Sequence, residues 1–156
     1  MADREKEDNF SFNQIEKTYY DEHYGDYVMN QNERHLKARH PERCKKVEDI
    51  LKNKKTCPEE SIYQLGTIDE HVSAEILFRV FDEFKKEFDD RFGSNVHIID
   101  WSLHMDEATP HIHERHVFDA TNRYGEIEPK QEEALKELGF ELPQPDKPRS
   151  RNNNRN

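Results

Sequence analysis

The clearest periodic pattern of apolar positions lies between residues 74 and 92, in "AEILFRVFDEFKKEFDDRF". The spacing places the apolar positions on one face of a helix, and a stripe of this kind is typical of packing against a protein core. Ser73 is a favourable N-cap, and Gly93 is a favourable stop. The predicted stripe repeats at steps of four, three and four: Leu77, Phe81, Phe84 and Phe88.

The segments that follow this helix have the pattern of strands. Residues 95–105, "NVHIIDWSLHM", are rich in β-branched and aromatic residues and predict a strand. "DEATP" predicts a turn, and "HIHERHVF" at 111–118 predicts a second strand that returns beside the first. An earlier run, "SIYQLG" at 61–66, predicts another short strand. The two long segments together predict a β-hairpin.

Weaker signals complete the order of elements. "PERCKKVEDILKN" at 41–53 and the segment 129–139 both predict short helices. The order helix, strand, long helix, strand, strand, helix indicates an α+β fold, an antiparallel sheet with a central β-hairpin and flanking helices. We expect three parts in a segment of a longer protein: a partly disordered or helical extension at 1–40, one domain at 41–142, and a disordered basic tail at 143–156.

Composition narrows the class of protein. The 156 residues are 37% charged and 32% hydrophobic, which suits one domain with a small core. The sequence shows neither a long apolar run nor a secretory signal, so we expect a cytoplasmic protein that does not enter a membrane. Cys44 and Cys57 lack metal-ligand spacing and are expected to be free thiols. The net charge of -10 argues against non-specific coating of nucleic acid but leaves room for a local, metal-assisted site.

Histidines gather in the predicted hairpin. Four of the nine fall between His104 and His116. His111 and His113 have the same strand parity and point to one face, and a short turn brings His104 opposite the start of the returning strand. Imidazole ligands of this kind suit a divalent ion such as manganese, zinc, iron or nickel. In the turn, Glu107 is a candidate fourth ligand or a group that orients a bound water.

Other residues near the cluster have ordinary alternatives. His116 has the opposite strand parity from His113, so we leave it out of the ligand set. Asp106 is equally suited to a turn. Arg115 shares the parity of the metal ligands and is a candidate contact for a DNA phosphate, with an ordinary exposed arginine as the alternative. The histidines elsewhere in the chain are expected to be surface or hydrogen-bonded residues.

The segment "LHMDEATPHIH" resembles the third motif of the plasmid mobilisation and recombination relaxases, the Mob/Pre group of the HUH single-strand DNA endonucleases. The resemblance covers about residues 45–120, and outside this motif the chain is compatible with the family without being specific to it. The family pattern of histidine, Asp-Glu and Pro-His-x-His is matched at every position: His104, Asp106, Glu107, Pro110, His111 and His113.

The resemblance implies a fold, a cofactor and a reaction. Relaxases of this class have a central antiparallel sheet flanked by helices, and their histidine cluster holds a divalent cation, usually manganese or magnesium. The cation polarises a scissile phosphate at the transfer origin while a nucleophile attacks and stays joined to single-stranded DNA. Carried over, His104, His111 and His113 are the metal ligands, and Glu107 is a fourth ligand or catalytic helper.

The nucleophile is where the sequence departs from the family. Relaxases take a histidine or tyrosine from a motif near the N-terminus, and the local likeness "QNERHL" puts Gln31 at that position. Either this alignment is false, or the nucleophile lies upstream, or the protein binds metal without nicking. His35 is a remote substitute. Four tyrosines could also substitute, although packing is their more ordinary role: Tyr19, Tyr20, Tyr24 and Tyr27.

Three functions therefore stay open. The leading hypothesis is a relaxase-like domain of a plasmid mobilisation or recombination protein, which performs metal-dependent nicking and joining of single-stranded DNA. The rival is a catalytically degenerate module that binds metal and DNA. The third is a cupin-like or hydrolytic metalloenzyme acting on a small molecule, but the chain has too few predicted strands to close a cupin barrel.

Overall fold

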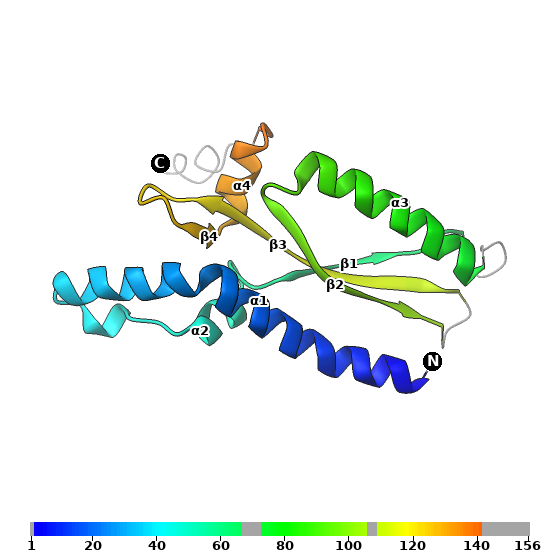
Figure 1. Cartoon of the computed structure of the whole chain (residues 1–156), viewed down its shortest axis with the longest axis horizontal. Coiled ribbons are helices and arrows are strands. Elements are labelled where there is room, and N and C mark those ends of the chain that lie inside the picture. Colours follow the sequence, from blue (N-terminus) through cyan, green and yellow to red (C-terminus); the bar gives the residue numbers. More distant parts are fainter. Residues whose placement is uncertain (1, 67–72, 106–108, 142–156) are drawn as a thin grey trace, which may run out of the picture.

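The computed structural model describes residues 2–66, 73–105 and 109–141, with side chains from residue 13 onward. These segments form a mixed α+β fold built around an antiparallel sheet (Figure 1). Its elements, in chain order, are α1 (Ala2–Lys37), a 3₁₀ helix η1 (Pro41–Arg43), α2 (Val47–Lys52), β1 (Glu59–Tyr63), α3 (Ala74–Phe92), β2 (Val96–His104), β3 (His111–Thr121), β4 (Ile127–Pro129) and α4 (Gln131–Glu137).

The sheet has four strands, and β3 is its centre. β3 pairs antiparallel with β1 and β2, and its C-terminal end pairs with β4. The predicted hairpin is therefore confirmed as β2 and β3, but it is not central, because β2 lies at an edge of the sheet. Its register shifts by one residue between Ile98 and Asp100, which is the signature of a β-bulge. Near the end of the hairpin two pairs of residues oppose each other: His104 with His111, and Ser102 with His113.

Helix α3 covers one face of the sheet (Figure 1). Leu77 and Phe81 pack there against Ile112 of β3, and all three are at most 3% exposed. Ser73 caps the helix as predicted, because its hydroxyl accepts a hydrogen bond from the backbone N–H of Ile76 at 3.3 Å. The predicted apolar stripe is only partly buried, however. Phe84 is 39% exposed, because it contacts the edge strand β1 rather than the middle of the sheet.

Helix α1 covers the opposite face (Figure 1). Tyr20 and Tyr24 are fully buried there, together with Val28, against Val117 of β3 and Ile50 of α2. These tyrosines lie one helical turn apart, so they form a single stripe. Tyr20 and Tyr24 therefore have the ordinary role of tyrosines on a helix, which is packing. No helix in the described part of the chain, α1 included, has the length and apolar character needed to cross a membrane.

The helix predicted at 41–53 is divided into η1 and α2. Between them, Cys44 and Lys46 have extended backbone angles. The side-chain amide of Asn32 on α1 explains the break, because it donates to the carbonyl of Lys45 at 2.7 Å and accepts from its N–H at 2.8 Å. This pair of bonds takes up backbone groups that a continuous helix would need.

The C-terminal elements extend the sheet and then end in a short helix. β4 pairs with the end of β3, and α4 begins directly afterwards, within the helix predicted at 129–139. Gly139 ends α4 with a positive φ of 94°, and the N–H of Phe140 reaches back to the carbonyl of Leu135 at 2.9 Å. This is a Schellman motif, whose left-handed position favours glycine. The tail predicted at 143–156 lies outside the described residues.

Candidate metal centre

Three histidines converge at the end of the hairpin where β2 ends and β3 begins. His104 is the last residue of β2, and His111 and His113 start β3. One nitrogen from each of the three rings lies within 4.8 Å of the others. The ring centroids are 4.0 to 5.3 Å apart. The strand parity that predicted this convergence therefore holds, and the three side chains could hold one metal ion.

Two of these rings are held by hydrogen bonds from Nδ1. The Nδ1 of His111 donates to the backbone carbonyl of Thr109 at 3.1 Å, and the Nδ1 of His113 donates to the carboxylate of Glu60 on β1. Carbonyl and carboxylate oxygens only accept, so Nδ1 must carry the proton in both rings. The other nitrogen, Nε2, then has the lone pair that a metal requires. This arrangement of a ligand and its supporting acceptor is common at protein metal sites.

The third ring is held from its own strand. Nε2 of His104 lies 3.1 Å from the hydroxyl of Ser102, which is 1% exposed. A serine hydroxyl can donate or accept, so this contact fixes the direction of the ring without fixing its tautomer. Ser102 also lies opposite His113 in the sheet. All three imidazoles are therefore oriented by neighbouring groups.

Glu60 is a site residue that sequence analysis missed. It belongs to β1, where it lies opposite Arg115 of β3, and its carboxylate reaches diagonally to His113. Diagonal neighbours on adjacent strands lie within reach of long side chains. The signal in the sequence is weak, two glutamates just before the strand predicted at 61–66, because the contact depends on the register between distant segments.

Arg115 lies on the same face as the three histidines, but two carboxylates already hold it. Its Nε donates to Glu16 of α1 at 2.6 Å, and its Nη1 lies 3.8 Å from Glu60. Burial alone would lower the pKa of Arg115, yet Glu16 and then Glu60 hold that pKa above its ordinary value. A DNA contact by Arg115 stays a prediction. Glu107 and Asp106 lie outside the described residues.

The opposite face of β3 carries a second polar cluster. Glu114 is 1% exposed and accepts from the Nδ1 of His116 at 2.9 Å and from the hydroxyl of Tyr63 at 3.0 Å. Burial, and then the Glu114 carboxylate, raise the pKa of Tyr63 to about 12. His116 thus points away from the metal ligands, as its strand parity predicts.

The alternative nucleophiles do not join the metal centre. Tyr20 donates its hydroxyl to the carbonyl of Thr56 at 2.6 Å, and Tyr24 donates to the carboxylate of Asp119 at 2.8 Å. Burial raises the pKa of both tyrosines well above the ordinary value, which opposes a reactive phenolate. Both hydroxyls are committed to hydrogen bonds with groups outside α1.

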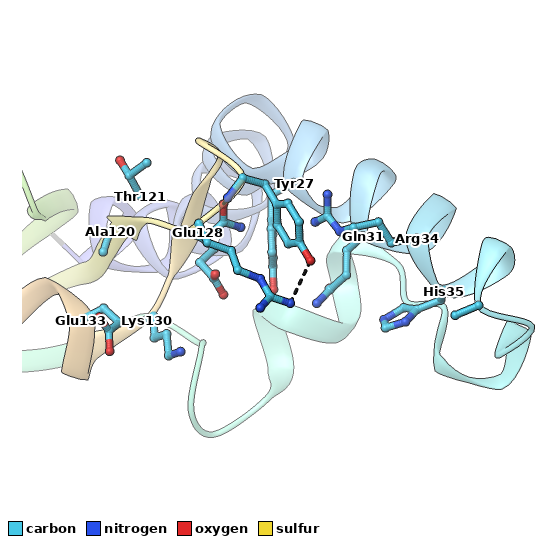
Figure 2. A pocket seen from close by; sticks show the side chains of 13 residues that line it. Tyr27, Gln31, Arg34, His35, Ala120, Thr121, Glu128, Lys130 and Glu133 are labelled. Carbon is cyan, nitrogen blue, oxygen red and sulfur yellow. Dashed lines mark hydrogen bonds between the residues drawn. The ribbon is translucent and has the colours of Figure 1, made fainter.

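Gln31 and His35 lie elsewhere as well. They line a cavity of about 610 Å³ between the end of α1 and the β3–β4–α4 region (Figure 2). The cavity is lined by Ala120 of β3, which lies nine positions along the strand from His111. At about 3.3 Å a residue, this is roughly 30 Å. Tyr27 lines the same cavity, and burial, followed by the nearby Glu128, raises its pKa to about 12.

The donor set fits a first-row divalent cation. Three imidazole nitrogens suit iron, nickel or zinc, whereas magnesium and manganese prefer oxygen ligands. Three ligands also leave coordination positions for water or substrate, which is typical of catalytic rather than structural metal sites. Comparison with known proteins adds no family to this picture, because no family model, no curated protein and no solved structure matches the chain.

Proposed function

We propose that the chain is a relaxase-like domain that nicks and joins single-stranded DNA with the help of a divalent metal, at the transfer origin of a plasmid. The observation that carries the proposal is the convergence of His104, His111 and His113. These residues belong to the motif that resembles the Mob/Pre relaxases. The HUH-type architecture is part of the proposal, supported by an antiparallel sheet whose β2–β3 hairpin carries the cluster.

The chain's own residues would prepare the site before substrate arrives. Glu60 and the carbonyl of Thr109 direct Nε2 of His113 and His111 inward, and Ser102 restrains His104. A bound divalent cation would supply Lewis-acid chemistry at a phosphodiester oxygen. Because the ligands are oriented in advance, little of the binding energy is spent on ordering side chains. We propose manganese as the ion to test first, because it is one of the ions used by the relaxases that the motif resembles.

One rival keeps the metal site without the enzyme. Tyr20 and Tyr24 donate their hydroxyls to Thr56 and Asp119 rather than to groups of the metal centre. Gln31, at the position aligned with the family nucleophile, lies in a separate cavity. These observations favour a module that binds metal and DNA without cutting.

The test combines a cleavage assay with a metal titration. Purified chain is incubated with labelled single-stranded oligonucleotides and Mn²⁺, and a denaturing gel detects both cleavage and a protein-linked DNA end. Calorimetric titration measures Mn²⁺ binding separately. We expect His111→Ala to abolish both signals, because it removes one of three ligands. The matched control is His40→Ala, at an exposed histidine that pairs with Glu42, and it should leave both signals unchanged.

The outcomes separate the two functions. Nicking that depends on Mn²⁺ and on His111 would support the relaxase-like enzyme. Metal binding without nicking would refute nicking by this chain and leave the binding module or an incomplete enzyme. Absence of metal binding by the wild-type chain, or unchanged stoichiometry in His111→Ala, would refute the proposed metal centre itself.

A further inference from the structure

A chain of alternating charges leads from helix α1 to the metal centre. Its members are Glu16 of α1, Arg115 of β3 and Glu60 of β1, which we name the Glu16–Arg115–Glu60 relay. The guanidinium of Arg115 binds Glu16 through Nε at 2.6 Å and Nη2 at 3.4 Å. Its Nη1 lies 3.8 Å from Oε1 of Glu60. The other oxygen of Glu60, Oε2, accepts from Nδ1 of His113.

The first link of the relay is anchored by burial. Glu16 is 4% exposed and belongs to α1, the helix that packs on this face of the sheet. A buried carboxylate without a cation is costly, and breaking such a pair destabilises a protein by several kcal/mol. The side chain of Arg115 is 28% exposed, so water can hydrate its guanidinium only in part. Glu16 therefore holds the guanidinium against the sheet and keeps it from turning outward into solvent.

The second link, between Arg115 and Glu60, sets the orientation of the Glu60 carboxylate. This side chain is 39% exposed, so without a partner on the sheet it could turn outward into solvent. Arg115 lies opposite Glu60 across the two strands and attracts Oε1, which leaves Oε2 for His113. Each oxygen thus has a different partner. Losing the cation would free the carboxylate to rotate or to become solvated, and His113 would lose its fixed acceptor.

We propose that Arg115 is a positioning residue of the metal centre. Anchored by Glu16, it holds Glu60 so that His113 stays in the Nδ1–H tautomer and presents Nε2 to a metal. The docking of α1 on the sheet is thereby coupled to the affinity of the histidine cluster. The proposal goes beyond DNA cleavage, because it concerns the orientation of a ligand with or without a reaction.

The first measurement needs no metal. Long-range proton–nitrogen NMR spectra of the full chain, labelled with ¹⁵N-histidine, report which ring nitrogen of His113 carries the proton. They are recorded at a pH where imidazole is ordinarily neutral. We expect one Nδ1–H tautomer in the wild type and a mixture of tautomers in Arg115→Met. Arg115→Lys, which keeps the charge but loses the planar fork, should fall between them.

An internal reference separates positioning from general loss of structure. Nε2 of His97 contacts the buried carboxylate of Asp119 at 3.0 Å on the same face of the sheet, away from the relay. Its tautomer should stay unchanged in every variant that folds. A matched arginine control is Arg79→Met on α3, where the arginine is 73% exposed and pairs within its own helix. That variant should leave both histidines as in the wild type.

The second measurement is the dissociation constant for Mn²⁺. Removal of a group that supports a metal ligand typically weakens affinity about 10- to 100-fold, and we expect about 10-fold for Arg115→Met because it acts through Glu60. Glu16→Gln should weaken affinity less, and Glu60→Gln at least as much. Lysine at position 115 should recover part of the loss.

Two results would overturn the positioning role. One is an unchanged His113 tautomer in Arg115→Met while His97 also keeps its own. The other is weaker binding of an oligonucleotide without metal, with His113 unaltered, which would make Arg115 a DNA contact instead. If the chain fails to nick DNA, neither result changes, so failure of the proposed function and failure of the relay are distinguishable.

Discussion

Replacement of Tyr24 by phenylalanine tests whether the tyrosines of α1 serve packing or catalysis. Tyr24 is fully buried and donates its hydroxyl to Asp119, a carboxylate that is 5% exposed and also contacts His97. Burial, and then Asp119, raise the pKa of Tyr24, so the hydroxyl remains a donor throughout the pH range of a folding experiment. Tyr24→Phe therefore removes one of two side-chain partners of a buried charge and leaves the ring in place.

The expected loss follows from the charge on the acceptor. Hydrogen bonds to charged groups contribute about 1.5 to 3 kcal/mol, so Tyr24→Phe should lower the free energy of unfolding by about 2 kcal/mol. Tyr20 provides a matched control within the same helix. It is equally buried, and its ring stands 4.9 Å from that of Tyr24, but it donates to the neutral carbonyl of Thr56. Tyr20→Phe should cost only about 1 kcal/mol.

Urea denaturation at neutral pH, followed by circular dichroism, measures both losses. A third variant, Tyr124→Phe, reports on a tyrosine that is 50% exposed and should change stability by less than about 0.5 kcal/mol. A loss below 0.5 kcal/mol in Tyr24→Phe, or equal losses in the two buried variants, would refute the assignment of a charged buried acceptor. If the chain nicks DNA, Tyr24→Phe should retain that activity, because the hydroxyl is committed to Asp119.

Two further perturbations probe other parts of the fold. Arg34 holds Glu126 by two hydrogen bonds, at 2.8 and 3.0 Å, and lowers the pKa of Glu126 to about 2. Because the folded pKa is depressed, the stabilisation is present above about pH 4.5 and is lost as the pH falls toward 2. Glu126→Gln should therefore cost about 1 kcal/mol at pH 7 and progressively less in acid, as measured by urea denaturation at each pH. In the sheet, Ile112 is fully buried under α3, so Ile112→Ala should cost about 3 kcal/mol, and a loss below 1 kcal/mol would contradict its central place in that core.

The elements with strong local periodicity were predictable from sequence. Helix 74–92 was predicted with its Ser73 cap because apolar spacing, cap and stop residue all agree within one segment. The hairpin and its histidines were predictable for the same reason, since strand parity and a short turn determine which side chains share a face. None of these features depends on contacts with distant parts of the chain.

Features that depend on distant contacts were not predictable. The stripe on α1 consists of Glu16, Tyr20, Tyr24 and Val28, and its tyrosines and glutamate give little hydrophobic contrast to a periodicity analysis. The break in the helix predicted at 41–53 depends on the side chain of Asn32, and only the folded chain brings it to that backbone.

The supporting shell of the metal centre belongs to the same class. The sequence predicted the three histidine ligands, but Glu60 reaches His113 from a strand 53 positions away, and Glu16 reaches Arg115 from 99 positions away. The three ligands lie in one sequence motif, whereas Glu60 and Glu16 come from distant parts of the sequence.

The β-bulge in β2 has a consequence for changes in chain length. His97 and His104 are seven residues apart, an odd number that would put them on opposite faces of a regular strand. The extra residue between Ile98 and Asp100 restores a common face, with His97 opposite Val117 and His104 opposite His111. Deletion of Ile99 would remove the extra residue and leave His97 and His104 six positions apart, so both would stay on the common face of a regular strand. An insertion elsewhere between the two histidines would turn part of β2 over or require a second bulge, so this strand should tolerate the loss of Ile99 far better than the gain of a residue.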